Sequence, residues 1–175
     1  MKGQPNELFK TLIDGLIVRE MTRRCTYDPI WINLIKGILD DELTSTFSRE
    51  KEKLEAHKMV TILWDHYQKC GYLSARILDY LDSDTIQLVD RKVIKELVDS
   101  LPEKPFQVIT IHDCFRCLPN YGNDLRTQYI RQLYEIARSN LLSYILSQLL
   151  NRTITIDKYD PSLANDILGS NYALS

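Results

Sequence analysis

The sequence predicts a mainly α-helical fold that contains one small antiparallel β-hairpin. Apolar residues recur at helical spacing along most of the chain, and only six glycines and six prolines interrupt it. Residues 106–112 differ, because they are rich in β-branched residues and alternate apolar with polar side chains. The chain has 175 residues, of which 44% are hydrophobic, which is enough for one compact domain with a core.

Three helices are expected in the first half of the chain. The first covers residues 6–24, whose apolar side chains share one face. The second opens at Asp28-Pro29, an acidic cap followed by proline at the first helical position. The third runs from about 45 to 69, with a charged half expected in solvent and an apolar half expected in the core. Gly71 is expected to stop it.

Two further helices are expected at residues 72–80 and 83–101, the second capped by Ser83. The hairpin follows within residues 106–118. Its first strand is 106–112, its return strand is 115–118, and its tight connection contains residues 112–114.

The rest of the chain is expected to be helical again. After Pro119, a long helical region covers residues 122–150 and is broken near Ser139-Asn140. Residues 153–156 form a short extended piece, and an amphipathic stretch follows at 161–168.

Composition and charge exclude some classes of protein. The formal net charge is −2, so a basic footprint over the whole chain is absent and a free-standing DNA-binding module is disfavoured. A local patch within a larger assembly would still suffice for nucleic-acid contact. No signal-type segment and no bilayer-spanning apolar run is present, which indicates a cytosol-like compartment with reduced thiols.

Two features have spacing that can carry chemistry. Cys114-x-x-Cys117 has metal-ligand spacing, but no second Cys or His pair accompanies it, so a structural role is expected. Asp113 directly follows the apolar strand. Spacing alone favours a turn-forming role for it, with His112 as an edge residue, over a carboxylate positioned for catalysis. An acidic cluster that includes Asp79 and Asp82 has the positions of ordinary helix caps.

Residues 107–115, Gln-Val-Ile-Thr-Ile-His-Asp-Cys-Phe, resemble the palm motif of the single-subunit RNA polymerases of phages and mitochondria. That family ends an apolar strand with His-Asp-Ser/Cys-Phe. A proline, a long helical region and a terminal tail follow in the same order as in the family. Here the tail is residues 166–175, which look like the family's C-terminal foot with its Ile-Leu-x-Ser segment. Upstream, residues 77–86 are similar to another family segment, in which Leu81-Asp82 match and Asp79 replaces a histidine.

The resemblance covers about residues 75–175 as a palm-like C-terminal region, and residues 1–74 form a helical segment of unassigned role. It implies that Asp113 is one of two palm aspartates that bind catalytic Mg²⁺ and that His112 orients the hairpin. It also implies that the foot, with Tyr172 and Ser175, lies near the same site.

One carboxylate cannot hold two magnesium ions, and the family's Asp-Gly-Ser and fingers motifs are absent. The expected function is therefore part of a DNA-dependent RNA polymerase that is inactive alone. The chain would be a C-terminal fragment, a subunit of a split polymerase or a degenerate relative, and the remaining polymerase chain or subunit would supply the second aspartate and the fingers. The assembly would bind template DNA, nascent RNA and nucleoside triphosphates, with no membrane.

Two alternatives remain open. One is a palm fragment of a family A type DNA polymerase, in which an acidic residue commonly follows the His-Asp pair. The other is a helical interaction module without catalysis, in which Asp113 is a turn residue. The expected location is the cytoplasm of a phage-infected host cell, with the mitochondrion as the second choice.

Overall fold

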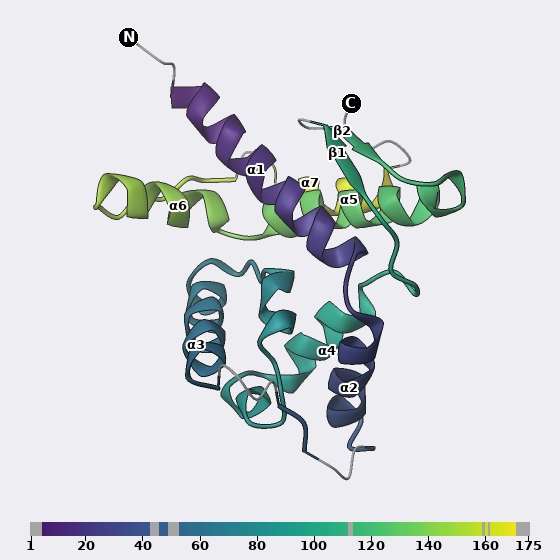
Figure 1. Ribbon diagram of the computed structural model, residues 1–175. Helices are drawn as coiled ribbons and strands as arrows, with labels where there is room; N and C mark the ends of the chain where they lie inside the picture. Colours follow the sequence, from purple (N-terminus) through teal and green to yellow (C-terminus); the bar gives the residue numbers. More distant parts are fainter. Residues whose placement is uncertain are drawn as a thin grey trace.

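The computed structural model describes residues 5–42, 46–48, 53–111, 114–158, 160 and 162–170, with side chains from Thr11 onward. Within these residues the chain is mainly helical and has one two-stranded antiparallel sheet, so the predicted fold class is confirmed. The upper half in Figure 1 holds the sheet and helices α1 (Pro5–Cys25), α5 (Gly122–Arg138), α6 (Leu141–Leu150) and α7 (Leu163–Gly169). The lower half holds helices α2 (Pro29–Leu39), α3 (Lys53–Cys70) and α4 (Arg91–Asp99). Three short 3₁₀ helices complete the described elements, η1 (Ala75–Asp79), η2 (Thr85–Leu88) and η3 (Pro119–Tyr121).

The lower half has its own apolar core. It is formed by five helical elements, α2, α3, α4, η1 and η2. Each contributes at least one almost fully buried side chain, namely Ile35, Val60, Ile94, Ile77 and Ile86 in that order. Trp31 packs against this cluster and donates a hydrogen bond from its indole N–H to the carbonyl of Leu78 at 3.0 Å. Because none of these short elements could bury its apolar face alone, the five depend on one another.

A second core lies in the upper half, between α1, the base of the hairpin and α5. Met21 and Cys25 of α1 are fully buried there, together with Phe106 just before the hairpin. The ring of Phe106 stacks on that of Tyr121, with 4.8 Å between ring centroids. This core fixes where the hairpin leaves the body of the molecule.

The joint between the two halves combines a small apolar cluster around Cys70, Tyr72 and Leu141 with a set of buried polar groups. Glu20 of α1 is 1% exposed, and its carboxylate accepts hydrogen bonds from the hydroxyl of Ser74 and from the backbone N–H of Ala75, the latter at 2.8 Å. Arg23 donates to the same carboxylate at 2.7 Å. The buried charge is therefore paired, as a buried carboxylate must be.

Several local predictions are confirmed. Asp28 caps α2 by accepting hydrogen bonds from the N–H groups of Ile30 and Trp31, and Pro29 occupies the first helical position. Gly71 ends α3 with a φ of 75°, a left-handed conformation that glycine adopts without strain. The predicted break near Ser139-Asn140 separates α5 from α6.

The helix predicted for residues 45–69 starts too early. Residues 46–48 are not helical and α3 begins at Lys53, while 45 and 49–52 lie outside the described residues. The N–H of Phe47 donates to the Ser83 hydroxyl at 3.0 Å, and the Ser83 N–H donates to the Phe47 carbonyl at 3.2 Å. These long-range bonds take backbone groups that a helix would use.

The helix predicted for residues 72–80 is also wrong. Residues 72–74 are not helical, and only the 3₁₀ helix η1 follows them. The Ala75 N–H, at the start of η1, is taken by the Glu20 carboxylate. A partner from α1 thus fixes where this element begins, and the local sequence does not contain that information.

The helix predicted for residues 83–101 is divided into η2 and α4. The Asp82 carboxylate accepts hydrogen bonds from the N–H groups of Asp84 and Thr85, at 3.0 and 2.8 Å, and so caps η2. The carboxylate of Asp90 then accepts a hydrogen bond from the N–H of Lys92 at 2.8 Å and caps the start of a separate helix, α4. Two acidic caps eight residues apart therefore specify two helices.

Candidate active site at the β-hairpin

The predicted hairpin is present. Strand β1 (Ile109–Ile111) pairs antiparallel with strand β2 (Cys114–Arg116), and Ile111 lies opposite Cys114. The first strand was expected at residues 106–112, but β1 begins three residues later, at Ile109. The return strand was expected at 115–118, but β2 begins one residue earlier and ends two residues earlier, so Cys114 lies in a strand and not in the connection. A two-residue connection is the commonest hairpin loop, because its twist matches that of the strands.

The predicted site residues of the hairpin are the two residues between these strands. His112 and Asp113 lie outside the described residues, and so do Tyr172 and Ser175 of the expected foot. What the structure defines is the support on either side of Asp113. That support is a pair of strands held in register by backbone hydrogen bonds up to Ile111 and Cys114.

One face of the hairpin is anchored on α5. Phe115 lies in the upper core, with its ring 5.6 Å from the ring of Tyr129 of α5. Val108 and Cys117, which flank the strands, pack in the same cluster. Phe115 is partly buried there, and because successive side chains of a strand point to opposite faces, its neighbours Cys114 and Arg116 point outward.

The outward face is apolar and exposed. Ile109 and Ile111 of β1 are 55% and 48% exposed, and they lie opposite Arg116 and Cys114 of β2. A two-stranded sheet of this kind has two unpaired edges as well. The hairpin is thus firmly seated on one side and uncovered on the other.

Helix α7, which includes the first residues of the predicted foot, packs against α5. The hairpin packs against the same helix through Phe115 and Tyr129. In Figure 1 α7 lies close to α5 in the upper half of the molecule, below the strands. One helix therefore supports both the hairpin and the start of the C-terminal segment.

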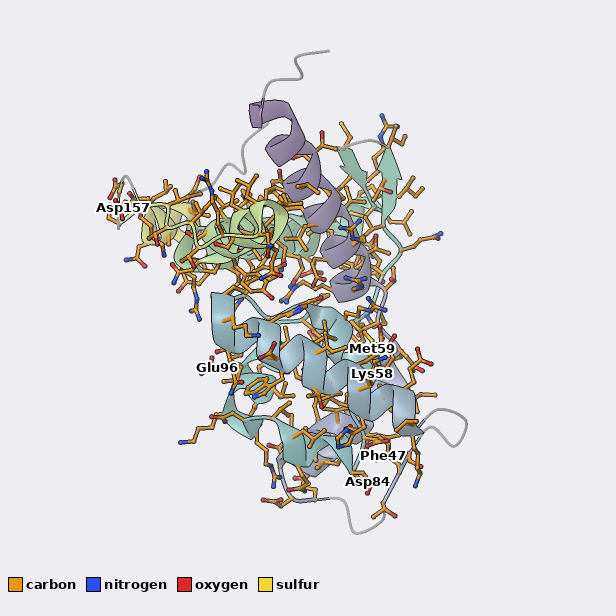
Figure 2. The ribbon with its side chains drawn as sticks, turned by 90° about the vertical axis from the view of Figure 1, so that its left-hand side faces the viewer. Phe47, Lys58, Met59, Asp84, Glu96 and Asp157 are labelled. Atoms are coloured by element: carbon orange, nitrogen blue, oxygen red, sulfur yellow. The ribbon has the colours of Figure 1, made fainter. Side chains whose placement is uncertain are left out.

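The upstream segment that includes Asp79 and Asp82 is not brought to the hairpin. Asp82 is 4% exposed and its carboxylate is engaged in capping η2. Figure 2 shows its neighbour Asp84 near the bottom of the molecule, whereas the strands lie at the top. The role of Asp82 in this structure is that of a helix cap, one of the roles expected for the acidic cluster.

Two of the thiols near the hairpin, those of Cys25 and Cys117, are favoured in the protonated form. Burial raises the pKa of Cys25 to about 12, and it also raises the pKa of Cys117. Thiolates, not thiols, bind metals. Within the part of the chain that the structure describes, no group of three or more His, Cys, Asp or Glu side chains gathers in a metal-binding arrangement, and His112 and Asp113 lie outside that search.

The sequence interpretation missed a buried polar group at the joint of the two halves. Arg24 lies at the end of the first predicted helix and was given no buried partner, but it is 2% exposed, and Gln128 and Gln132 of α5 are buried with it. A signal was present, because Arg24 continues the buried stripe of α1 that includes Ile17 and Met21. A cation at such a position needs buried partners.

No family model matches the chain, and no curated protein matches it. Among the described helices, none is both long enough and apolar enough to cross a membrane.

Proposed function

We propose that this chain is part of a single-subunit-type DNA-dependent RNA polymerase and contributes Asp113 to nucleotidyl transfer. The observation that carries the proposal is the pairing of Ile111 with Cys114 in an antiparallel hairpin. The chain therefore reverses direction across the His112-Asp113 pair, as the palm motif that these residues resemble requires.

A carboxylate beside the end of a seated strand pair suits this role. Catalysis needs its groups held within a fraction of an ångström, and the packing of Phe115 on Tyr129 supplies such support for the strands. Magnesium is a hard cation that prefers oxygen ligands, so an aspartate is a fitting donor. When bound, a magnesium pair activates the RNA 3′ hydroxyl and stabilises the pyrophosphate that leaves. His112 would orient the hairpin connection.

The proposal includes a partner chain. Two metal ions need more than one carboxylate, and Asp14-Gly15, the nearest match to the family's other motif, lies within helix α1. The second aspartate and the fingers would therefore come from a separate chain. In the assembly, template DNA, nascent RNA and nucleoside triphosphates would meet at the hairpin.

The C-terminal foot is part of the same proposal. Helix α7 packs against α5, which also carries the hairpin. Tyr172 and Ser175 follow α7 within a few residues, so a short path would bring them toward the site. Their contribution would be to position substrate, since neither offers a metal-binding carboxylate side chain.

The test is nucleotide incorporation by the assembly that this chain forms. The polymerase is purified through a tag on the N-terminus of this chain, and template-dependent incorporation is measured with Mg²⁺. We expect Asp113→Asn to lower the rate by about 10²- to 10⁴-fold without loss of assembly, because a metal ligand is removed. Asp99→Asn, an exposed aspartate of α4, should leave the rate unchanged and serves as the control.

Other outcomes favour the alternatives. Incorporation of deoxyribonucleotides in preference to ribonucleotides indicates a DNA polymerase. A normal rate in Asp113→Asn, or no incorporation by any assembly of this chain, indicates a non-catalytic interaction module. The chain alone should incorporate neither kind of nucleotide.

A further inference from the structure

A small cavity lies at the joint between the two halves of the molecule. Its volume is about 70 Å³, and α1, α3, α4 and α5 all contribute to its wall. Glu96 of α4, labelled in Figure 2, belongs to the wall from the lower half. The opposite wall is formed by α5 and includes Arg131, Gln132 and Arg138.

Arg24 reaches the cavity in a fixed orientation. Its Nε donates to Oε1 of Gln128 at 2.7 Å, and its Nη2 donates to the carbonyl and hydroxyl of Ser100 at 3.2 and 2.5 Å. Its remaining terminal nitrogen, Nη1, has no hydrogen-bond partner within the part of the chain described. Arg24 as a whole is 2% exposed and lines the cavity, so its free nitrogen offers a cationic donor to whatever occupies the cavity.

Gln132 supplies a second donor. It is 2% exposed, and its Oε1 accepts a hydrogen bond from the Tyr72 hydroxyl at 2.7 Å. Its Nε2 has no acceptor among the residues that the structure describes, and Gln132 lines the same cavity as Arg24. Among the described residues no buried side-chain nitrogen or oxygen lacks a partner, so these two donors are accessible from the cavity, where an acceptor from outside the chain can replace water.

The charges around the cavity favour an anion. Three arginines, Arg24, Arg131 and Arg138, face two glutamates, Glu96 and Glu135. Glu135 is already engaged by Nε of Arg138 at 3.1 Å and of Arg131 at 3.8 Å. Burial lowers the pKa of Arg24, and neighbouring Arg131 acts in the same direction, so a bound anion would stabilise the charged guanidinium.

We propose that this cavity binds a single tetrahedral oxyanion with the chemistry of a phosphate group. Nη1 of Arg24 and Nε2 of Gln132 donate to it from within, and Arg131 and Arg138 face it from the α5 side. The volume admits several water molecules or one phosphate group, and it leaves no room for a base and sugar inside. The phosphate is either free inorganic phosphate or the terminal phosphate of a nucleotide. The proposal does not rest on the polymerase assignment.

The test uses the full 175-residue chain and inorganic phosphate at constant ionic strength, with binding measured by calorimetry. We expect saturable binding of one phosphate per chain. Arg131→Gln combined with Arg138→Gln should weaken binding by about tenfold or more, because charge-assisted hydrogen bonds are lost. Both side chains are partly exposed, with 38% and 45% of their surface accessible, so the variant is expected to fold.

Two further variants test whether phosphate affinity depends on the charges that line the cavity. Arg152→Gln removes the same charge from an exposed position that does not line the cavity, and it should change the affinity by less than about twofold. Glu96→Gln removes a negative charge from the wall and should strengthen binding about threefold. A purely structural role for the cavity predicts neither the loss in the double arginine variant nor this gain.

The two sources of phosphate are separated by competition. If adenosine monophosphate binds no better than inorganic phosphate, the ligand is free phosphate. If it binds more tightly and a 5′-phosphorylated oligonucleotide competes while its unphosphorylated counterpart does not, the ligand is a terminal phosphate. The proposal is overturned if phosphate shows no saturable binding, or if the double arginine variant binds it as tightly as the unaltered chain.

Discussion

Arg24 of α1 donates a hydrogen bond from Nε to Oε1 of Gln128 in α5, over 2.7 Å and across 104 positions of the chain. Gln128 in turn donates from Nε2 to the carbonyl of Ser100 at 2.8 Å, which also accepts from Arg24. These hydrogen bonds connect α1, the end of α4 and α5 at one buried site.

The first prediction concerns this tie. Gln128→Leu removes both bonds and leaves the buried Nε of Arg24 without its acceptor, so we expect the free energy of unfolding to fall by about 1–3 kcal/mol. Urea denaturation followed by circular dichroism measures it. Gln68→Leu, at an exposed position of α3, is the matched control and should change stability by less than about 0.5 kcal/mol. Equal stability of the two variants would contradict the prediction.

The second prediction concerns Glu20, which bridges to η1. Glu20→Gln keeps the shape of the side chain but removes the charge that accepts from Arg23, Ser74 and Ala75. We expect a loss of about 1.5–3 kcal/mol, the range for hydrogen bonds to charged groups. The measurement is again urea denaturation, with exposed Glu55→Gln as control. A loss below that of the control would mean that the bridge contributes nothing.

The elements that were predicted correctly are determined by residues near them in the sequence. Asp28-Pro29 starts α2 and Gly71 ends α3 through capping and backbone conformation, and both depend on immediate neighbours. The hairpin was predicted because alternation in residues 106–112 is also local, although the strand bounds differ from the prediction by one to three residues.

The missed features are decided by residues far away in sequence. Residues 46–48 stay non-helical because Phe47 bonds to Ser83, and η1 starts where Glu20 binds Ala75. The buried joint depends on Arg24 meeting Gln128, which no periodicity indicates. Local sequence patterns do not reveal contacts between residues that are far apart in the sequence, and these contacts decide the features that were missed.

The third prediction concerns the seat of the hairpin. Phe115→Ala removes the ring that packs on Tyr129, while the lower core has no contact with it. We expect faster amide hydrogen exchange, by about tenfold or more, in residues 109–116, with little change in α4. Mass spectrometry of exchange resolves the two regions. In the proposed polymerase the same variant should lower nucleotide incorporation, because Asp113 loses its fixed support.

Ile109→Thr is the control for that experiment. Ile109 is 55% exposed on the opposite face of the hairpin, and threonine keeps a β-branched side chain. Exchange in the isolated chain should therefore change little. If Ile109→Thr and Phe115→Ala accelerate exchange equally, the hairpin is not held through its α5 face.

The last prediction concerns alkaline pH. Burial raises the pKa of Cys25 from 9.0 to about 12, and burial raises the pKa of Tyr72 well above its usual value of 10.0. Both groups are neutral when protonated, so they lose protons in the unfolded chain at lower pH than in the folded chain. Their contribution to stability is therefore complete below about pH 9 and is lost as pH rises toward 12.

We expect the free energy of unfolding to fall by about 1–2 kcal/mol between pH 9 and 10.5 through Cys25, since each proton contributes about 1.4 kcal/mol per pH unit. Urea denaturation at four values of pH in this range gives the slope. Cys25→Ala should make the slope shallower, although it lowers stability at every pH by opening space in the core. Cys114→Ala, which removes an exposed thiol, is the control variant. If stability falls with pH at the same slope in Cys25→Ala and in Cys114→Ala, Cys25 is not the group that links stability to pH.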